Sequence, residues 1–346
     1  MKKVQIEIIQ GKTADELKAD LKNRRYSILD SIGCKKLRTK MLFLGYVATV
    51  LVSLYVFLSK LLSGKEWKLR FRRFVVSVLK RPTPYMLDED DVLPRSGNGM
   101  VIGFNHPSLG EILRIIELLA KEYPEKNYLF PVTLPWFEAF CPIVDKLSEA
   151  GIVITPIVTP SVLKKVEEIA GKEQADILNK MNRGFNNEYL NLCKEFLSKG
   201  GIVVVAPAAT RQRTIFNTDE EIMMKTKISP QTMSFLVSML SRNNSFDDVI
   251  ILPIAVKPEK GFKNGVNVGM TYRLGVAEAF TFDEAVKLTN EKYGDFNGRK
   301  FDYEFLGRIT KKMFKMYEYD LIAPFEDKGA YDYLAKILDY TNEAAY

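Results

Sequence analysis

The chain has 346 residues, 47% of them hydrophobic and 27% charged, which excludes disordered and fibrous proteins and allows one large domain or two ordinary ones. Its three cysteines form no CxxC pair, which favours reduced thiols in the cytosol over a disulfide framework or a zinc site. The net charge of +7 is uneven, because residues 1–81 carry 19 lysines and arginines against 6 acidic residues. We therefore expect an anionic surface to be the partner of this N-terminal quarter.

The N-terminal region is predicted to contain a basic segment, residues 1–40, followed by a membrane anchor. Within the basic segment, a helix is expected over Thr13–Leu29. Residues 41–59 are uncharged and, as a helix, about as long as a bilayer core is thick; a buried core helix is the alternative. Residues 66–81 place aromatic and valine side chains at helical spacing among basic ones, which is typical of a helix in an anionic lipid interface. We predict that residues 41–81 anchor the chain, either with a transmembrane helix or with a helix pair that dips into one leaflet. Both flanks of the apolar run are basic, which favours the helix pair.

Beyond a predicted linker over residues 82–99, short apolar runs alternate with helical segments up to the end of the chain. Continuous runs of valine and isoleucine are typical of strands buried on both faces. Residues 100–346 are therefore predicted to form an α/β fold with a mixed, mostly parallel sheet surrounded by helices, preceded by the N-terminal membrane-docking helices. The five expected strands are Met100–Phe104, Tyr128–Val132, Gly151–Ile154, Ile202–Ala206 and Val249–Val256. Helices are expected over 162–199 with a break near Asn182–Asn187, and at Ser229–Arg242, Tyr303–Tyr319 and Gly329–Thr341.

One connection between a strand and a helix carries the candidate chemistry. His106, the only histidine in the chain, lies two residues after the strand Met100–Phe104, and imidazole is the side chain that titrates near neutral pH. Glu111 would hold one ring nitrogen and leave the other free to take a proton from a substrate hydroxyl. In the alternative, Ser108 and Glu111 form a capping box, and Glu111 only accepts bonds from backbone N–H groups.

A second candidate lies after the strand Ile202–Ala206, where the chain continues as Pro-Ala-Ala-Thr-Arg-Gln-Arg. Ligands of α/β sheets bind beyond the carboxyl ends of the strands. Arg211 and Arg213 would make bidentate contacts to a phosphate there. The alternative is a solvated basic loop. Two further strand ends, at Thr155-Pro156 and near Pro253, are expected at the same edge.

Together these stretches resemble the glycerophospholipid acyltransferase family, the PlsC-like O-acyltransferases, over about residues 100–260. That family carries N-H-x4-D, a G-x-x-F-I-D-R-like strand end, F-P-E-G-T-R, and a hydrophobic strand with a proline. The resemblance implies that Arg211 binds the acceptor's phosphate and that Pro253 lines the acyl-donor side. Under it, the catalytic residues are His106 and Glu111, and the substrate-binding residues are Asn105, Thr210, Arg211, Arg213 and Pro253.

The sequence departs from the family's pattern in three motifs. Glu111 stands where the family has aspartate; lipid A-type lauroyl transferases, with H-x4-D/E, are also similar. Ala208 and Ala209 replace the glutamate and glycine of the third motif. Pro156 and Ile157 stand where the second motif has its Asp-Arg pair, so the acceptor site is altered.

The resemblance implies a membrane-associated O-acyltransferase of phospholipid biosynthesis, with its catalytic domain on the cytoplasmic face. The enzyme would move a fatty acyl group from acyl-CoA or acyl carrier protein to a hydroxyl of lysophosphatidate or glycerol 3-phosphate. Expected partners are membrane lipid, the acyl donor and a glycerol phosphate or lysophospholipid acceptor, with no nucleic acid. No cofactor or metal is expected, because the chain has no Walker sequence and no second histidine. The alternatives are a non-catalytic lipid-binding relative and a lipid A-type lauroyl transferase.

Overall fold

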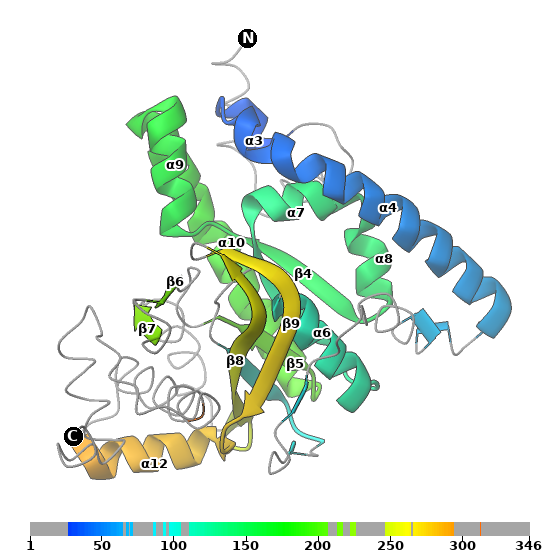
Figure 1. Cartoon of the computed structure of the whole chain (residues 1–346), viewed down its shortest axis with the longest axis vertical. Coiled ribbons are helices and arrows are strands. Elements are labelled where there is room, and N and C mark those ends of the chain that lie inside the picture. Colours follow the sequence, from blue (N-terminus) through cyan, green and yellow to red (C-terminus); the bar gives the residue numbers. More distant parts are fainter. Residues whose placement is uncertain are drawn as a thin grey trace. The chain divides into compact units, whose positions relative to one another are not determined.

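The computed structural model describes two compact units, Met1–Arg72 with Asn127–Glu195, and Arg73–Lys126 with Phe196–Tyr346 (Figure 1). The boundaries predicted at residues 40, 81 and 99 stay predictions. The residues described are 27–64, 67–68, 70–71, 86–87, 93–94, 97–104, 111–206, 213–216, 222–225, 246–263, 266–293 and 312. The helices predicted at Ser229–Arg242, Tyr303–Tyr319 and Gly329–Thr341, and most of those at Thr13–Leu29 and 66–81, lie outside these residues.

The first unit contains a parallel pair of strands with helices before, between and after them. The strands pair from Tyr128↔Ile152 to Thr133↔Ile157. The chain enters through α3 and α4, forms β3, continues through three short helices to β4, and leaves through α9 and α10. The bounds are α3 (Ile28–Ser31), α4 (Lys35–Ser63), β3 (Tyr128–Thr133), α7 (Leu134–Phe140), η2 (Cys141–Ile143), α8 (Val144–Glu149), β4 (Ile152–Ile157), α9 (Pro160–Ala170) and α10 (Lys172–Ser198).

The segment that begins at Ser27 belongs to the core of this unit. One cluster of buried side chains joins Ile28, Leu29, Ile32 and Cys34 to side chains of α7, α9 and α10. The buried carboxylate of Glu138 accepts hydrogen bonds from Ser27 Oγ at 2.5 Å and from the Leu29 amide at 3.1 Å, which fixes the start of α3. Residues 27–34 are therefore integral to the fold and not a detachable basic tail.

The apolar run 41–59 lies within α4, whose one side packs on α7, η2 and α8 (Figure 1). Lys146 Nζ donates to Ser53 Oγ at 2.5 Å, and Lys60 Nζ lies 2.5 Å from Glu149 Oε2. Within the part of the chain that the structure describes, none of the helices is both long and apolar enough to cross a membrane. This corrects the prediction of a transmembrane helix: the segment is helical, but the protein's own helices occupy one of its sides.

The break predicted near Asn182–Asn187 is wrong, because α10 runs through both residues. The helical stretch is interrupted instead at Gly171, whose φ of +90° suits glycine. Asn182 has another role: its side-chain Oδ1 accepts from the Val158 amide and its Nδ2 donates to the Val158 carbonyl, both at 3.2 Å. The amide thus satisfies the backbone where β4 has just ended.

The second unit is built on a sheet with strand order β1-β9-β8-β2-β5, and β10 also pairs with β8. β2 runs parallel to both β5 and β8, whereas β9 and β10 are antiparallel to β8. β6 and β7 form a separate antiparallel pair. The bounds are β1 (Met86–Leu87), β2 (Met100–Phe104), α6 (Glu111–Glu122), β5 (Ile202–Val205), β6 (Arg213–Phe216), β7 (Ile222–Lys225), β8 (Ile250–Lys263), β9 (Val266–Val276), β10 (Phe280–Thr281) and α12 (Phe282–Tyr293).

The two units confirm the predicted mixed, mostly parallel sheet with helices around it. All five apolar runs are strands: β2, β3, β4, β5 and β8. Several strands lie outside these runs and were not predicted, among them β6, β7 and β10. Met86–Leu87, within the predicted linker, pairs with β9, and β9 itself was not predicted. The three cysteines are buried and form no disulfide.

The amino end of β2 is tightly packed against the turn that precedes β5. A Cβ on Gly99 would lie 2.4 Å from the Leu197 carbonyl oxygen, far inside van der Waals contact. Lys126 Nζ donates to the carbonyls of Asn98 and Gly200, each at 2.7 Å, and burial lowers the pKa of this lysine. The start of β2 is thus held in place through its backbone.

Gly99→Ala is expected to lower the free energy of unfolding by about 1–3 kcal/mol, because Leu197 or the start of β2 must shift. Urea denaturation measures the change. Gly97→Ala is the matched control, since a Cβ on Gly97 has nothing within 4 Å. Equal losses in the two variants would show that the packing at Gly99 is not the cause.

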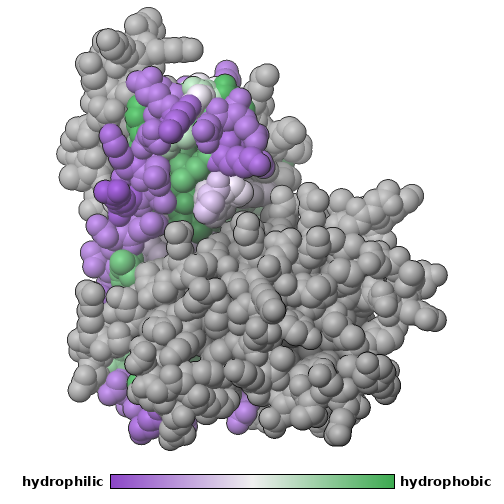
Figure 2. Space-filling view, turned by 90° about the vertical axis from the view of Figure 1, so that its left-hand side faces the viewer, coloured by the Kyte–Doolittle hydropathy of each residue, from purple (hydrophilic) through white to green (hydrophobic). Residues whose placement is uncertain are grey.

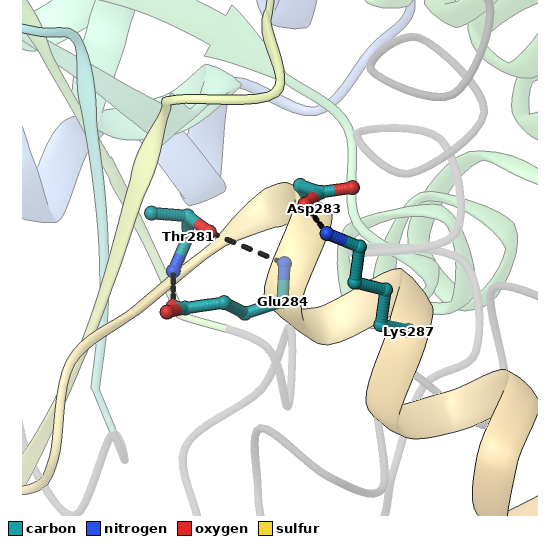
Figure 3. A network of polar contacts seen from close by, with 4 residues as sticks. All are labelled: Thr281, Asp283, Glu284 and Lys287. Atoms are coloured by element: carbon teal, nitrogen blue, oxygen red, sulfur yellow. Dashed lines mark hydrogen bonds and ion pairs between the residues drawn. The ribbon is translucent and has the colours of Figure 1, made fainter.

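α12 begins with a reciprocal capping box (Figure 3). The Thr281 amide donates to Glu284 Oε2 at 2.7 Å, and the Glu284 amide donates to Thr281 Oγ1 at 3.2 Å. One turn further along, Lys287 Nζ lies 2.5 Å from Asp283 Oδ2. Glu284 is thus a carboxylate that caps a helix, the role that the alternative interpretation gives to Glu111.

Candidate functional site

Two neighbouring parallel strands of the second unit's sheet, β2 and β5, end side by side, next to residues near the start of β8. Gly103 of β2 is in register with Val205, the last residue of β5, and with Pro253 of β8. The side chains of all the β2 and β5 residues are buried, so the strands are held from both faces. An edge of this kind, where parallel strands end and loops begin, is where α/β proteins bind ligands.

His106 and Asn105 follow β2 directly but lie outside the described residues. In the sequence, His106 is two residues beyond Phe104, the last residue of β2. On the other side, α6 begins at Glu111, whose side chain also lies outside the described part. The strand before this connection and the helix after it are thus as predicted. The roles of His106 and Glu111 stay predictions, and the capping-box alternative stays open with Ser108.

Three of the predicted substrate-binding residues follow β5 in the sequence. Thr210 and Arg211 lie outside the described residues, five and six positions beyond Val205. Arg213 is the first residue of β6, opposite Lys225 of β7, so its backbone belongs to a strand and not to a loop. The phosphate clamp remains a prediction, since the structure describes the side chain of neither arginine.

The second motif does not lie beyond a strand end, which corrects the prediction. Thr155 and Pro156 are inside β4, which continues to Ile157 and pairs with β3 along its whole length. Thr155 is fully buried. This motif also belongs to the first unit, whereas the row at Gly103 belongs to the second.

Sequence reasoning missed a buried ion pair one turn after Glu111. Arg114 Nη1 lies 2.5 Å from Glu117 Oε2, and both side chains are almost fully buried. Charged side chains are rarely buried to this degree unless they are paired. The available signal was the spacing Glu-x-x-Arg-x-x-Glu over residues 111–117, which puts opposite charges three residues apart on one helix.

A second missed feature is an arm formed by β8 and β9. β8 pairs with β2 only as far as Ile254 and then continues to Lys263, paired with β9 alone. The arm, residues 257–263 with 266–273, therefore extends past the end of β2, at the edge that His106 follows. Its signal in the sequence was Asn264-Gly265, a dipeptide typical of tight hairpin turns.

Comparisons with known proteins give a weak structural likeness. No protein-family model matches the sequence, and no curated protein matches it. Among solved structures, the chain is similar to the 1-acyl-sn-glycerophosphate (LPA) acyltransferase, PlsC, from Thermotoga maritima. The TM-score is 0.37 and the identity 15%, over 74% of this chain and 95% of that one. A likeness of this size carries no argument about function, which has to come from the residues of this chain.

Proposed function

We propose that this protein is an acyltransferase that moves a fatty acyl group from a thioester, acyl-CoA or acyl carrier protein, to a hydroxyl of a glycerol phosphate lipid. The observation that carries the proposal is the row formed by Val205, Gly103 and Pro253. Because of this register, the segments that contain His106 and Arg211 follow two adjacent strands in the sequence, β2 and β5, and Pro253 lies in the next strand, β8. These are the elements that an acid/base reaction on a phosphorylated substrate requires.

In this mechanism His106 is the general base. It takes the proton of the acceptor hydroxyl while the oxygen attacks the thioester carbonyl, and the tetrahedral intermediate then expels the thiolate. The imidazolium returns its proton to that thiolate, so the imidazole is regenerated and no covalent enzyme intermediate forms. Glu111 orients the ring and stabilises its protonated form.

Substrate binding is assigned to the loops around the same edge. Arg211 binds the phosphate of the acceptor with Thr210 beside it, and Arg213 adds a second cation. Asn105 lies next to the general base in the chain, and Pro253 lines the acyl-donor side. Ala208 and Ala209 remove a carboxylate and a glycine from the acceptor motif, so the acceptor is expected to differ from that of typical family members.

Association with the membrane is assigned to the side of α4 that faces away from α7 and α8, on the cytoplasmic leaflet. Exposed apolar side chains recur there at intervals of three and four residues, which makes a continuous ridge. Lys60, Lys68 and Arg70 are exposed nearby and would contact anionic headgroups. The ridge consists of Val47, Val50, Leu51, Leu54, Phe57, Leu58, Leu61 and Leu62.

Other described surface of the first unit differs from this ridge. In Figure 2 the residues coloured in the upper part of the view, where α9 and α10 lie, are mostly hydrophilic, with a narrow hydrophobic strip among them. Ile169 of α9 is an exposed large hydrophobic side chain outside α4. The apolar side chains of α4 are therefore a local feature, as a surface that lies in a lipid interface requires.

The proposal is tested by following thiol release from long-chain acyl-CoA and from acyl carrier protein. Lysophosphatidate, glycerol 3-phosphate and other lysophospholipids are screened as acceptors, and the acylated product is identified by mass spectrometry. We expect release that depends on one class of phosphorylated acceptor. Vesicle binding without transfer from either donor to any acceptor would favour the non-catalytic lipid-binding relative.

A further inference from the structure

Lys60, in the last turn of α4, has contacts with two other segments of the first unit. Its Nζ lies 2.5 Å from Oε2 of Glu149, the last residue of α8. The same Nζ lies 4.8 Å from the ring centroid of Trp67, which follows the end of α4 at Gly64. The lysine therefore joins α4, α8 and the segment after α4 at one point.

The contact between Lys60 and Glu149 is not what holds these segments together. Both side chains are about half-exposed, and ion pairs in contact with water and salt contribute little to folding. The segment after α4 is held by deeper packing, because the Phe71 side chain is fully buried and its ring centroid lies 6.3 Å from that of Tyr55. Lys60 is thus able to leave Glu149 while the unit stays folded.

Lys60 also borders the most exposed apolar side chains of α4. Leu61 and Leu62 follow it directly and are each 69% exposed, and both belong to the ridge assigned to the lipid interface. A lysine beside such a ridge keeps its ammonium group in the headgroup layer, which is also where tryptophan rings are enriched. In that layer the phosphates of anionic lipids attract the ammonium group of Lys60 and repel the carboxylate of Glu149.

We propose that Lys60 is an exchangeable latch: it pairs with Glu149 away from the membrane and with the phosphate of an anionic lipid when the α4 ridge enters the bilayer. Trp67 stays beside the lysine at headgroup level. Glu149 thereby lowers the affinity for membranes and makes binding depend on anionic lipid. The inference rests on the membrane association assigned under the proposed function, and it names the contact that regulates it.

Vesicle sedimentation tests the exchange without any need for turnover. Vesicles of phosphatidylcholine with and without phosphatidylglycerol are compared. Lys60→Gln is expected to weaken binding to the anionic vesicles about fivefold, the usual contribution of one lysine near such a surface. Glu149→Gln is expected to strengthen it by a similar factor, because the lysine no longer has to leave a carboxylate. Both positions are half-exposed, so melting temperatures near that of the wild type are expected.

A combined variant separates the exchange from a change in net charge, since Glu149→Gln also removes a negative charge. If the carboxylate acts by holding Lys60, Glu149→Gln changes binding little once Lys60 has been replaced by glutamine. Independent effects of the two substitutions would overturn the inference. Asp283→Asn is the matched control, because Asp283 forms an exposed ion pair of the same length with Lys287 in α12. It is expected to leave vesicle binding unchanged.

Trp67 reports on the same place by fluorescence. The chain has two tryptophans, so Trp136→Phe leaves Trp67 as the single emitter, and it keeps an aromatic ring against Phe140. We expect the emission to shift to shorter wavelengths with anionic vesicles and to stay unchanged with inorganic phosphate at equal ionic strength. A response to phosphate without vesicles would overturn the assignment to lipid. Unchanged emission in protein that sediments with vesicles would overturn the placement of this end of α4.

Failure of the proposed acyl transfer gives a different result from failure of the latch. In the first case the wild-type protein transfers no acyl group, yet Lys60 and Glu149 still act as a coupled pair in vesicle binding. An active wild type in which the two substitutions act independently would refute only the latch. A wild type that binds no anionic vesicles would overturn the latch together with the membrane association.

Discussion

His106→Ala is expected to lower kcat by about 10²–10⁴-fold, the usual contribution of a positioned general base. The melting temperature is expected to stay near that of the wild type, because His106 belongs to a connection and the buried strand β2 ends before it, at Phe104. Acceptor-dependent thiol release measures the first quantity and differential scanning calorimetry the second. Full activity in the folded variant would remove the chain's only histidine from the mechanism.

The same experiment separates the two interpretations of Glu111. A capping box accepts glutamine as readily as glutamate, whereas an orienting carboxylate has to stabilise an imidazolium, which a neutral amide does poorly. We expect Glu111→Gln to fold normally and lose most of its activity, and Glu111→Asp to keep a substantial fraction.

Glu284→Gln is the matched control, because Glu284 is a helix-capping glutamate in α12 (Figure 3). It is expected to change neither activity nor melting temperature by much. Near-full turnover in Glu111→Gln, equal to that of Glu284→Gln, would identify Glu111 as a second helix cap and leave His106 without an orienting group.

The strands could be predicted from the sequence because their signal is local. A strand buried on both faces needs an unbroken apolar run of four to eight residues, and runs such as Met100–Phe104 and Ile202–Val205 satisfy this by themselves. The order of strands is not local. Nothing in the sequence indicates that Pro253 pairs across from Gly103, although this register is what assembles the candidate site.

The predictions that were wrong concern segments whose structure depends on contacts with residues far away in the sequence. Residues 41–59 carry no charge, yet Ser53 and the neighbouring Lys60 contact Lys146 and Glu149, about 90 residues further along the chain. Asn182 was expected to interrupt a helix, but its side-chain amide forms hydrogen bonds with the backbone of Val158. Propensity ranks such residues correctly as weak helix formers, but tertiary contacts override it.

For the candidate site, the sequence predicts the types of the residues and their positions in the chain, but not the side chains that pack around them. The pattern from Asn105 to Glu111 suggests a base and a carboxylate, and the structure agrees that a strand ends before it and a helix begins at Glu111. The burial of Arg114 was not predictable, because charged residues on amphipathic helices are usually solvated. Arg114 is buried together with the carboxylate of Glu117, which it contacts.

The exposed ridge of α4 leads to the second large effect. Replacing Leu54, Phe57 and Leu61 with glutamate is expected to weaken binding to anionic vesicles by about 100-fold or more. These side chains are 56%, 64% and 69% exposed. Burying the exposed part of each one in a lipid interface therefore stabilises the bound state by about 1 kcal/mol. Since 1.4 kcal/mol is a factor of ten, three losses multiply to about two orders of magnitude. Vesicle sedimentation measures the binding.

Point substitutions test this surface better than removal of the N-terminus. A chain that begins after residue 81 would lose Ile28, Leu29 and Ile32 from the first unit's core, so it would fail for reasons unrelated to lipid. Ile169→Glu is the matched control, because it places the same charge on an exposed apolar position of α9. We expect it to leave vesicle binding unchanged, and we expect added salt to weaken wild-type binding, since Lys60, Lys68 and Arg70 contribute through screened charge. If the α4 triple variant binds as tightly as Ile169→Glu, α4 does not face the membrane.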